Sequence, residues 1–199
     1  MKIVSWNLYY KSGATLEHVS TIIEQEQPDI LLMQEATPGI DDIISKAGGD
    51  YSRQAWHGKS YGLAAWVAKG QIDSGLMPLP RSPVPSIFPR RAAQVLDMGS
   101  FRIVNVHLSH GQVLNRRQLA TIAKNVPGPL AIMGDFNIFG PAKIRGLRDV
   151  GPRYSTHRVQ KVVPLRLDRC LVRELGCRDS KVLEQGRSDH RPIMLELDI

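Results

Sequence analysis

The chain has 199 residues, of which 42% are hydrophobic and 23% are charged. This length fits one domain with a sizeable core, and the composition excludes a disordered or fibrous chain. No apolar run approaches the roughly 20 residues that a membrane helix needs. Cys170 and Cys177, the two cysteines, provide no disulfide framework, and no signal-peptide pattern precedes the first strand-like segment. We therefore expect a single domain in a reducing cytoplasm.

The net charge of +7 is unevenly distributed. Residues 1–140 hold 13 basic and 11 acidic residues, whereas residues 141–199 hold 13 and 8. A basic surface attracts polyanions such as nucleic acid, or an anionic membrane. Charge alone leaves open the alternative of an ordinary solvated surface.

The first half of the chain alternates between strand-like and helix-like segments. Lys2–Trp6 predicts a short strand, and Asp29–Met33 predicts a buried strand. Between them, apolar residues at helical spacing predict a helix that ends at Pro28. The apolar face of that helix consists of Leu16, Val19, Ile22 and Ile23. A weaker helical pattern spans Pro38–Ala47, and Gly62–Ala68 is strand-like.

The second half begins with a proline-rich stretch, residues 77–89, which predicts one long surface loop. Ala92–Leu96 and Phe101–Leu108 flank a turn signal and predict a β-hairpin. A helix is expected at Leu114–Lys124. The remaining predicted strands are Leu130–Met133, Leu165–Val172 and Ile193–Leu197. Helices mixed with both hairpins and crossovers favour a layered α/β fold, with helices outside packed sheets.

Polar residues follow the first two predicted strands. Asn7 is either a turn former or a residue that directs its amide oxygen at a metal or a metal-bound water. Glu35 emerges directly from a buried strand, where a carboxylate is costly unless it is paired or metal-bound. Because Mg²⁺ favours one or two carboxylates plus waters and substrate phosphate, Glu35 is a candidate ligand. A salt-bridged glutamate at the rim is the alternative.

His107 lies near the end of the predicted hairpin. Strand alternation places Ile103 and Asn105 on the same side as His107. A lone strand histidine is more often structural, and its functional role would be to donate a hydrogen bond or a proton to a phosphoryl group.

A glycine, an acid and an amide follow Leu130–Met133. Asp135 is suited to accept a proton from an attacking water, and Asn137 is suited to hold that water or the phosphate. A simple turn is the alternative.

Asp189 and His190 precede the last strand and supply a carboxylate beside an imidazole. Asp168, at the start of an apolar strand, is a candidate to orient His190 and raise its pKa. These motifs contain no Ser or Cys nucleophile with a partnered base. Direct attack by water is therefore favoured over a covalent intermediate.

In this order, the motifs resemble the signature of the endonuclease/exonuclease/phosphatase superfamily. The matching segments are Trp6-Asn7, Gln34-Glu35, His107-Leu108, Gly134-Asp135-Phe136-Asn137, Leu167-Asp168 and Ser188-Asp189-His190. They are specific for the superfamily and poorly specific for substrate. The resemblance implies one DNase I-like domain over residues 1–199. Its fold would be a four-layer α/β sandwich, with two mixed sheets face to face and helices outside.

The resemblance also implies one or two Mg²⁺ or Mn²⁺ ions. Glu35 would be the main metal ligand, Asn7 would support the metal site, and Asp189 would be a second metal-site or water-orienting carboxylate. The family often shows an arginine shortly after the His-Leu pair. Arg116 and Arg117 are near that place and are candidate phosphate-binding residues.

The remaining roles concern the chemical step. By resemblance, Asp135 activates water and Asn137 helps to place the water and the phosphate. His190, backed by Asp168, stabilises the pentacovalent transition state.

Two positions depart from the apurinic endonucleases of this superfamily. They carry an acidic residue where this chain has Tyr9, and a tyrosine where it has His107. Both differences make the chain more similar to the DNase I, sphingomyelinase and tyrosyl-phosphodiesterase members of the superfamily.

The sequence therefore predicts a metal-dependent phosphodiesterase, most simply a nuclease or a DNA-end-processing enzyme that binds nucleic acid. A phospholipid- or inositol-phosphate-directed hydrolase is the alternative, because a loop near Pro78–Arg91 is suited to touch a membrane. A non-catalytic binding module on the same fold is a third reading, and the complete set of polar residues argues against it.

Overall fold

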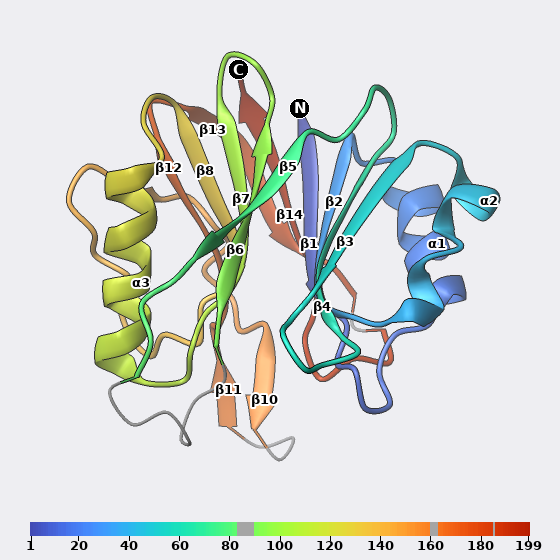
Figure 1. Cartoon of the computed structure of the whole chain (residues 1–199), viewed down its shortest axis with the longest axis horizontal. Helices are drawn as coiled ribbons and strands as arrows, with labels where there is room; N and C mark the ends of the chain where they lie inside the picture. Colours follow the sequence, from blue (N-terminus) through green and yellow to red (C-terminus); the bar gives the residue numbers. More distant parts are fainter. Residues whose placement is uncertain (83–89, 160–162, 185) are drawn as a thin grey trace.

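The computed structural model describes residues 1–82, 90–159, 163–184 and 186–199. Two six-stranded mixed sheets pack face to face, with helices α1 and α2 outside one sheet and α3 outside the other (Figure 1). The predicted four-layer α/β sandwich is thereby confirmed. None of the helices in these ranges has the length and apolar character of a membrane span.

The first sheet has the strand order β13-β14-β1-β2-β4-β3. Its strands are β1 (Lys2–Asn7), β2 (Ile30–Ala36), β3 (Asp50–Ala55), β4 (Gly62–Val67), β13 (Gly176–Val182) and β14 (Ile193–Asp198). Strands β1 and β2 are parallel, and the other neighbours are antiparallel. Helix α1 (Leu16–Glu26) connects the parallel pair. The predicted Pro38–Ala47 helix is two short pieces, a 3₁₀ turn at Pro38–Ile40 and α2 (Ile43–Ala47).

The second sheet repeats this plan with the order β5-β6-β7-β8-β12-β9. Its strands are β5 (Ser74–Pro78), β6 (Ala92–Asp97), β7 (Arg102–His107), β8 (Leu130–Asp135), β9 (Arg148–Asp149) and β12 (Asp168–Arg173). Here β7 and β8 are the parallel pair, connected by α3 (Gln112–Asn125). The antiparallel pairing of β6 with β7 confirms the predicted hairpin. A small separate hairpin joins β10 (His157–Val159) and β11 (Val163–Leu165).

The central parallel strands are buried on both faces, which explains their unbroken apolar runs. In β2, Ile30 and Leu32 pack into the core between the sheets. Leu31 and Met33 point the other way and pack with Val19 of α1. A third core forms where α3 covers the second sheet. The two-residue alternation of strands and the apolar stripe of each helix thus divide most of the buried apolar residues among three cores.

Sequence patterns were weakest at the sheet edges. No residue of strands β3, β5 and β13 is buried, so these strands lack the apolar runs that mark a buried strand. The predicted 77–89 loop is wrong at its start, because Met77 and Pro78 pair with β6. Residues 83–89 of that loop lie outside the described residues. The predicted Leu165–Val172 strand is divided, since β11 ends at Leu165 and β12 begins at Asp168.

Buried amides link the two sheets where they face each other. Asn105 donates hydrogen bonds to the main-chain oxygens of Met33 and Ala64 at 3.1 and 3.0 Å. Gln34 donates to the Asn105 side-chain oxygen at 2.8 Å and to Ser5 at 3.0 Å. Asn105 therefore faces the opposite sheet, on the same side of β7 as Ile103, as strand alternation predicts. Its bonds fix how β7 sits against β2 and β4.

We expect Asn105→Ala to destabilise the protein by about 2–4 kcal/mol, because it leaves buried carbonyl and amide groups without partners. Chemical denaturation followed by tryptophan fluorescence measures the change. Asn125→Ala, at the exposed end of α3, is the matched control and should change stability by no more than about 0.5 kcal/mol. Equal stabilities of the two variants would show that the amide link contributes nothing.

Candidate active site

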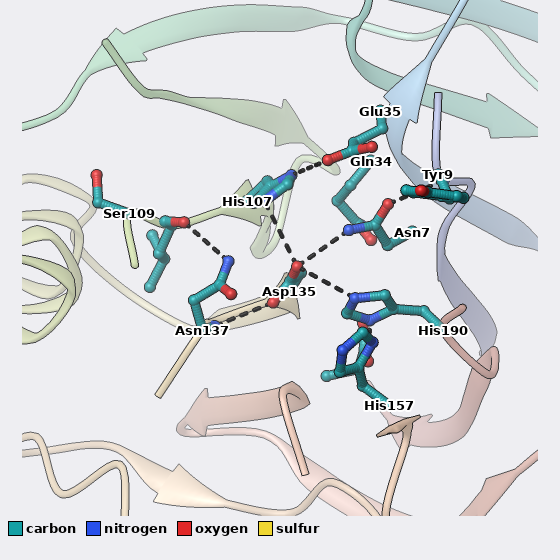
Figure 2. A network of polar contacts seen from close by, with 12 residues as sticks. Asn7, Tyr9, Gln34, Glu35, His107, Ser109, Asp135, Asn137, His157 and His190 are labelled. Atoms are coloured by element: carbon teal, nitrogen blue, oxygen red, sulfur yellow. Dashed lines mark hydrogen bonds and ion pairs between the residues drawn. The ribbon is translucent and has the colours of Figure 1, made fainter. Parts of the chain in front are cut away.

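Polar residues from both sheets meet at one edge of the sandwich (Figure 2). Asn7, His107 and Asp135 are the last residues of the parallel strands β1, β7 and β8. Strands β12 and β14 run antiparallel to β8 and β1, so their beginnings lie at the same edge. Asp168 is the first residue of β12, and His190 precedes β14. The fold thus brings together five residues that are far apart in sequence.

Glu35 reaches the site through an irregularity in β2. The pairing of β2 with β4 shifts between Gln34 and Ala36, and Glu35 has a φ of +56°, a left-handed conformation that costs energy for a non-glycine residue. One carboxylate oxygen accepts the Tyr10 backbone N–H at 3.0 Å. The other oxygen lies 3.8 Å from Nδ1 of His107. Burial raises the pKa of Glu35, opposed by the Tyr10 hydrogen bond.

The end of β8 and the turn that follows it set the position of Asp135. Gly134 has a φ of +140°, and a Cβ there would overlap the carbonyl oxygen of Val106. Asn137 is also left-handed, with a φ of +50°, and its backbone N–H donates to Asp135 Oδ1 at 3.0 Å. The Asn137 side chain donates to the carbonyl of Leu108 at 3.1 Å. This turn holds the Asp135 carboxylate in one orientation.

The second oxygen of Asp135 is the centre of the polar network in Figure 2. Asn7 Nδ2 donates to it at 3.0 Å, while His107 Nε2 and His190 Nε2 lie 3.4 and 3.8 Å away. Burial raises the pKa of Asp135, but the charge of His190 and the hydrogen bonds from Asn137 and Asn7 lower it by more. Asp135 is therefore ionised. The side-chain oxygen of Asn7 accepts the backbone N–H of Tyr9 at 3.1 Å.

The predicted contact between Asp168 and His190 is confirmed. His190 Nδ1 lies 2.8 Å from Asp168 Oδ2, and both residues are buried. Burial lowers the pKa of His190, but Asp168 and Asp135 raise it by more, to about 10. The imidazole is thus a cation at neutral pH, with Nε2 directed toward Asp135.

Sequence reasoning missed a buried arginine. Arg91 is only 6% exposed, its guanidinium lies 4.1 Å from the ring of Trp56, and Nη2 lies 3.3 Å from His107 Nε2. Burial lowers the pKa of Arg91 to about 10, opposed by Asp135 and Glu35. Its Nε and Nη1 groups are buried without a hydrogen-bond partner among the described residues. Two free donors of a cation are well suited to an anionic ligand.

The two arginines that were candidate phosphate ligands lie elsewhere. Arg116 donates to the carbonyl oxygens of Phe139 and Pro141 and so ties α3 to the segment after Asn137. Arg117 is exposed on α3. Neither lines the cavity that contains Asp135. The sequence offered no signal for Arg91, because it follows a proline-rich stretch and belongs to no recognisable motif.

The cavity at this edge has a volume of about 480 Å³. Its lining includes every candidate residue except Asp168, Arg116 and Arg117, and adds His110, His157, Tyr10 and Tyr61. Tyr10 and Tyr61 stack with ring centroids 3.9 Å apart. Asp189 is at the rim, with its side chain 40% exposed and one oxygen 4.0 Å from His157 Nδ1.

The donors at this edge fit a divalent cation. Among the described residues, His107 is the one ion-pair neighbour of Glu35. Burial and the Arg91 guanidinium hold the pKa of His107 well below its usual value, so this ring is neutral. Glu35 and Asp135 are therefore two carboxylates that lie on either side of an uncharged imidazole ring. Oxygen donors in this arrangement suit Mg²⁺ or Mn²⁺.

The fold and the site define a class of protein: a DNase I-like sandwich with acid, amide and imidazole groups at one edge of its sheets. The model of the Endonuclease/Exonuclease/phosphatase family matches residues 4–190 of the chain. The chain belongs to this family, whose name denotes the cleavage of phosphate esters.

Individual relatives are distant. A UPF0294 protein of Erwinia tasmaniensis is 29% identical over 136 residues, which cover 62% of this chain and only 49% of that protein. Among solved structures, a humanized D. rerio TDP2 matches with a TM-score of 0.80 and 18% sequence identity, and the match covers 100% of this chain and 99% of the TDP2 chain. D. rerio TDP2 complexed with single strand DNA product matches with a TM-score of 0.77 and 17% identity, covering 100% of this chain and 99% of that chain. A mannosyl-6-phosphatase of Bacteroides thetaiotaomicron matches with a TM-score of 0.76 and 17% identity, covering 100% of both chains. These similar structures show the fold.

The raised pKa of His190 predicts a dependence of stability on pH. The cation stabilises the folded state fully below the usual histidine pKa of 6.5, and this contribution is lost as the pH rises toward about 10. The double variant Asp168→Asn/His190→Gln lacks both titrating groups. Thermal unfolding in chelator should show its deficit in Tm shrinking between these two pH values.

His57→Gln, at an exposed position, is the control and should show no such trend. A deficit that stays constant over the range would mean that His190 is neutral in the folded protein.

Proposed function

We propose that this protein is a divalent-metal-dependent phosphodiesterase that cleaves nucleic acid by in-line attack of water. One observation carries the proposal: a single cavity contains an ionised acid, a protonated imidazole and a guanidinium with two free donors. These groups match the three needs of phosphodiester hydrolysis, which are a base, a stabiliser of developing charge and an anion ligand.

The cation would be held by Glu35, with Asn7 supporting the site and Asp189 as a further carboxylate at the rim. When bound, Mg²⁺ or Mn²⁺ neutralises charge on the phosphoryl oxygens and on the leaving group. Asp135 orients the attacking water and accepts its proton, since the bonds from Asn7 and Asn137 hold its carboxylate in place.

Protonated His190 donates a hydrogen bond from Nε2 to the phosphoryl group, where negative charge grows in the transition state. Asp168 fixes the ring by accepting a hydrogen bond from Nδ1–H, as in other carboxylate–imidazole pairs. Neutral His107 accepts from Arg91 at Nε2 and thereby holds the guanidinium toward the cavity. Asn137 helps to place the water and the phosphate.

Nucleic acid is the proposed substrate class because the excess of basic residues lies in residues 141–199. The similar TDP2 structure with a single-stranded DNA product supports the same choice. The similar mannosyl-6-phosphatase shows that the fold also occurs in an enzyme named for a sugar monoester. For a lipid substrate, the membrane-touching loop would include residues 83–89, which lie outside the described residues. The proposed setting remains the cytoplasm, in line with two free cysteines.

The central experiment incubates the purified chain with plasmid DNA, RNA, sphingomyelin, inositol phosphates and an aryl phosphodiester. We expect DNA cleavage with Mg²⁺ or Mn²⁺, none in EDTA, and suppression as salt rises. Asp135→Asn should lower kcat by roughly 100-fold or more in a variant that still folds, because it keeps the shape of the side chain and removes its basicity. Turnover of a lipid or sugar phosphate without cleavage of DNA or RNA would refute the proposed substrate, and full activity in EDTA would refute the mechanism.

A second prediction concerns Arg91. Arg91→Ala should lower kcat/KM by roughly 100-fold, and Arg91→Lys should recover little of it, because an ammonium cannot reproduce the planar guanidinium fork. Added guanidinium should partly rescue the alanine variant. Arg117→Ala is the matched control. Unchanged kcat/KM in a folded Arg91→Ala variant, or a loss of stability that accounts for the whole effect, would remove Arg91 from substrate binding.

A further inference from the structure

A second, larger cavity opens beside the catalytic one. It has a volume of about 930 Å³ and is lined by the segment from Ile138 to Arg153 and by residues 164–166 with Arg169. Phe139 and Leu165 line both this cavity and the catalytic cavity. The two hollows are therefore contiguous, and we call the second one the basic groove.

The charge of the basic groove is strongly positive. Its lining includes one acidic residue, Asp149, and six basic residues: Lys143, Arg145, Arg148, Arg153, Arg166 and Arg169. Arg166 and Arg169 lie 2.7 and 3.4 Å from the Asp149 carboxylate and also donate to backbone carbonyls. These two arginines stabilise the wall of the groove. Their charge is largely neutralised by Asp149, so they contribute little to binding an anion.

The other four basic residues of the groove are exposed and form no ion pair with a carboxylate among the described residues. Arg148 donates one hydrogen bond to the carbonyl of Leu175, which does not neutralise it. Four such cations along one hollow form a path for a chain of phosphates rather than a site for one anion.

An exposed aromatic ring lies on this path. Phe139 lines both cavities and is 55% exposed. Exposed aromatic rings between cations are the surface that single-stranded nucleic acids use, because unpaired bases stack on them. A duplex keeps its bases paired and would leave Phe139 without a partner.

We propose that a single strand of nucleic acid runs from the catalytic cavity, across Phe139, into the basic groove. This inference rests on the proposed function and extends it from a reaction to the path of a polymeric substrate. A sugar phosphate would fill the catalytic cavity and make no use of the groove.

The test measures binding apart from catalysis. Fluorescence anisotropy in EDTA gives the Kd of labelled single-stranded DNA of 3 and 12 nucleotides at several salt concentrations. Wild type should bind the 12-mer at least tenfold more tightly than the 3-mer. Arg145→Glu/Arg153→Glu should abolish most of that difference and reduce the magnitude of the salt slope by about 1.4, the value for two phosphate contacts on a single strand. Phe139→Ala should weaken 12-mer binding by roughly fivefold or more.

Lys69→Glu/Lys124→Glu is the matched control, since it makes the same change in net charge at residues that line neither cavity. The proposal is overturned if the groove and control variants bind the 12-mer alike. It is also overturned if wild type binds both lengths equally, or if it binds phosphatidylserine vesicles and not the oligonucleotide. Metal-dependent hydrolysis of an aryl phosphodiester by wild type tests the proposed function separately. Length-dependent binding that the groove variant loses would support the groove even if that hydrolysis is absent.

Discussion

The site depends on keeping one carboxylate ionised inside the protein. Asp135 is only 2% exposed, so its charge must be compensated by its neighbours. Asn7 and the Asn137 backbone supply hydrogen bonds, and His190 supplies a positive charge that Asp168 keeps on the ring. Each partner of Asp135 is itself held by a second group, so the position of the acid is over-determined. Such a network pre-organises the groups that would act on a phosphate, at the cost of burying several polar residues.

The double-sheet architecture is what makes this compensation possible. Each sheet has a central parallel pair, and the two pairs end at the same edge. A parallel pair directs its final residues to one side, and the antiparallel neighbours contribute their first residues there. Asn105 and Gln34 lie just below this edge and hold the sheets together through buried hydrogen bonds. The same strands therefore form the core and position the side chains of the site. A shift of one sheet against the other would separate Asn7 from Asp135.

The sequence predicts the fold and much of the site because both are encoded locally. The layered sandwich follows from apolar runs, and the confirmed contact of Asp168 with His190 follows from motifs at strand ends. Edge strands such as β13 escaped prediction because half-exposed residues carry no apolar period. Arg91 escaped because its importance comes from Trp56 and His107, which are distant in the chain. Arg116 is the opposite case. Its position in the sequence made it a candidate phosphate ligand, but in the structure it donates to a backbone carbonyl.

The distribution of charge shows why composition is a poor guide to a binding surface. Residues 141–199 carry an excess of basic residues, yet two of these arginines are held by Asp149 and by backbone carbonyls. What matters for a polyanion is the set of cations that remain unpaired and lie along one path. In this fold the segment after β8 carries Asn137 into the cavity that contains Asp135 and also forms a wall of the basic groove. Reaction and polymer binding would thus be built from one continuous stretch of chain, so that a strand bound in the groove approaches Asp135 along the same segment.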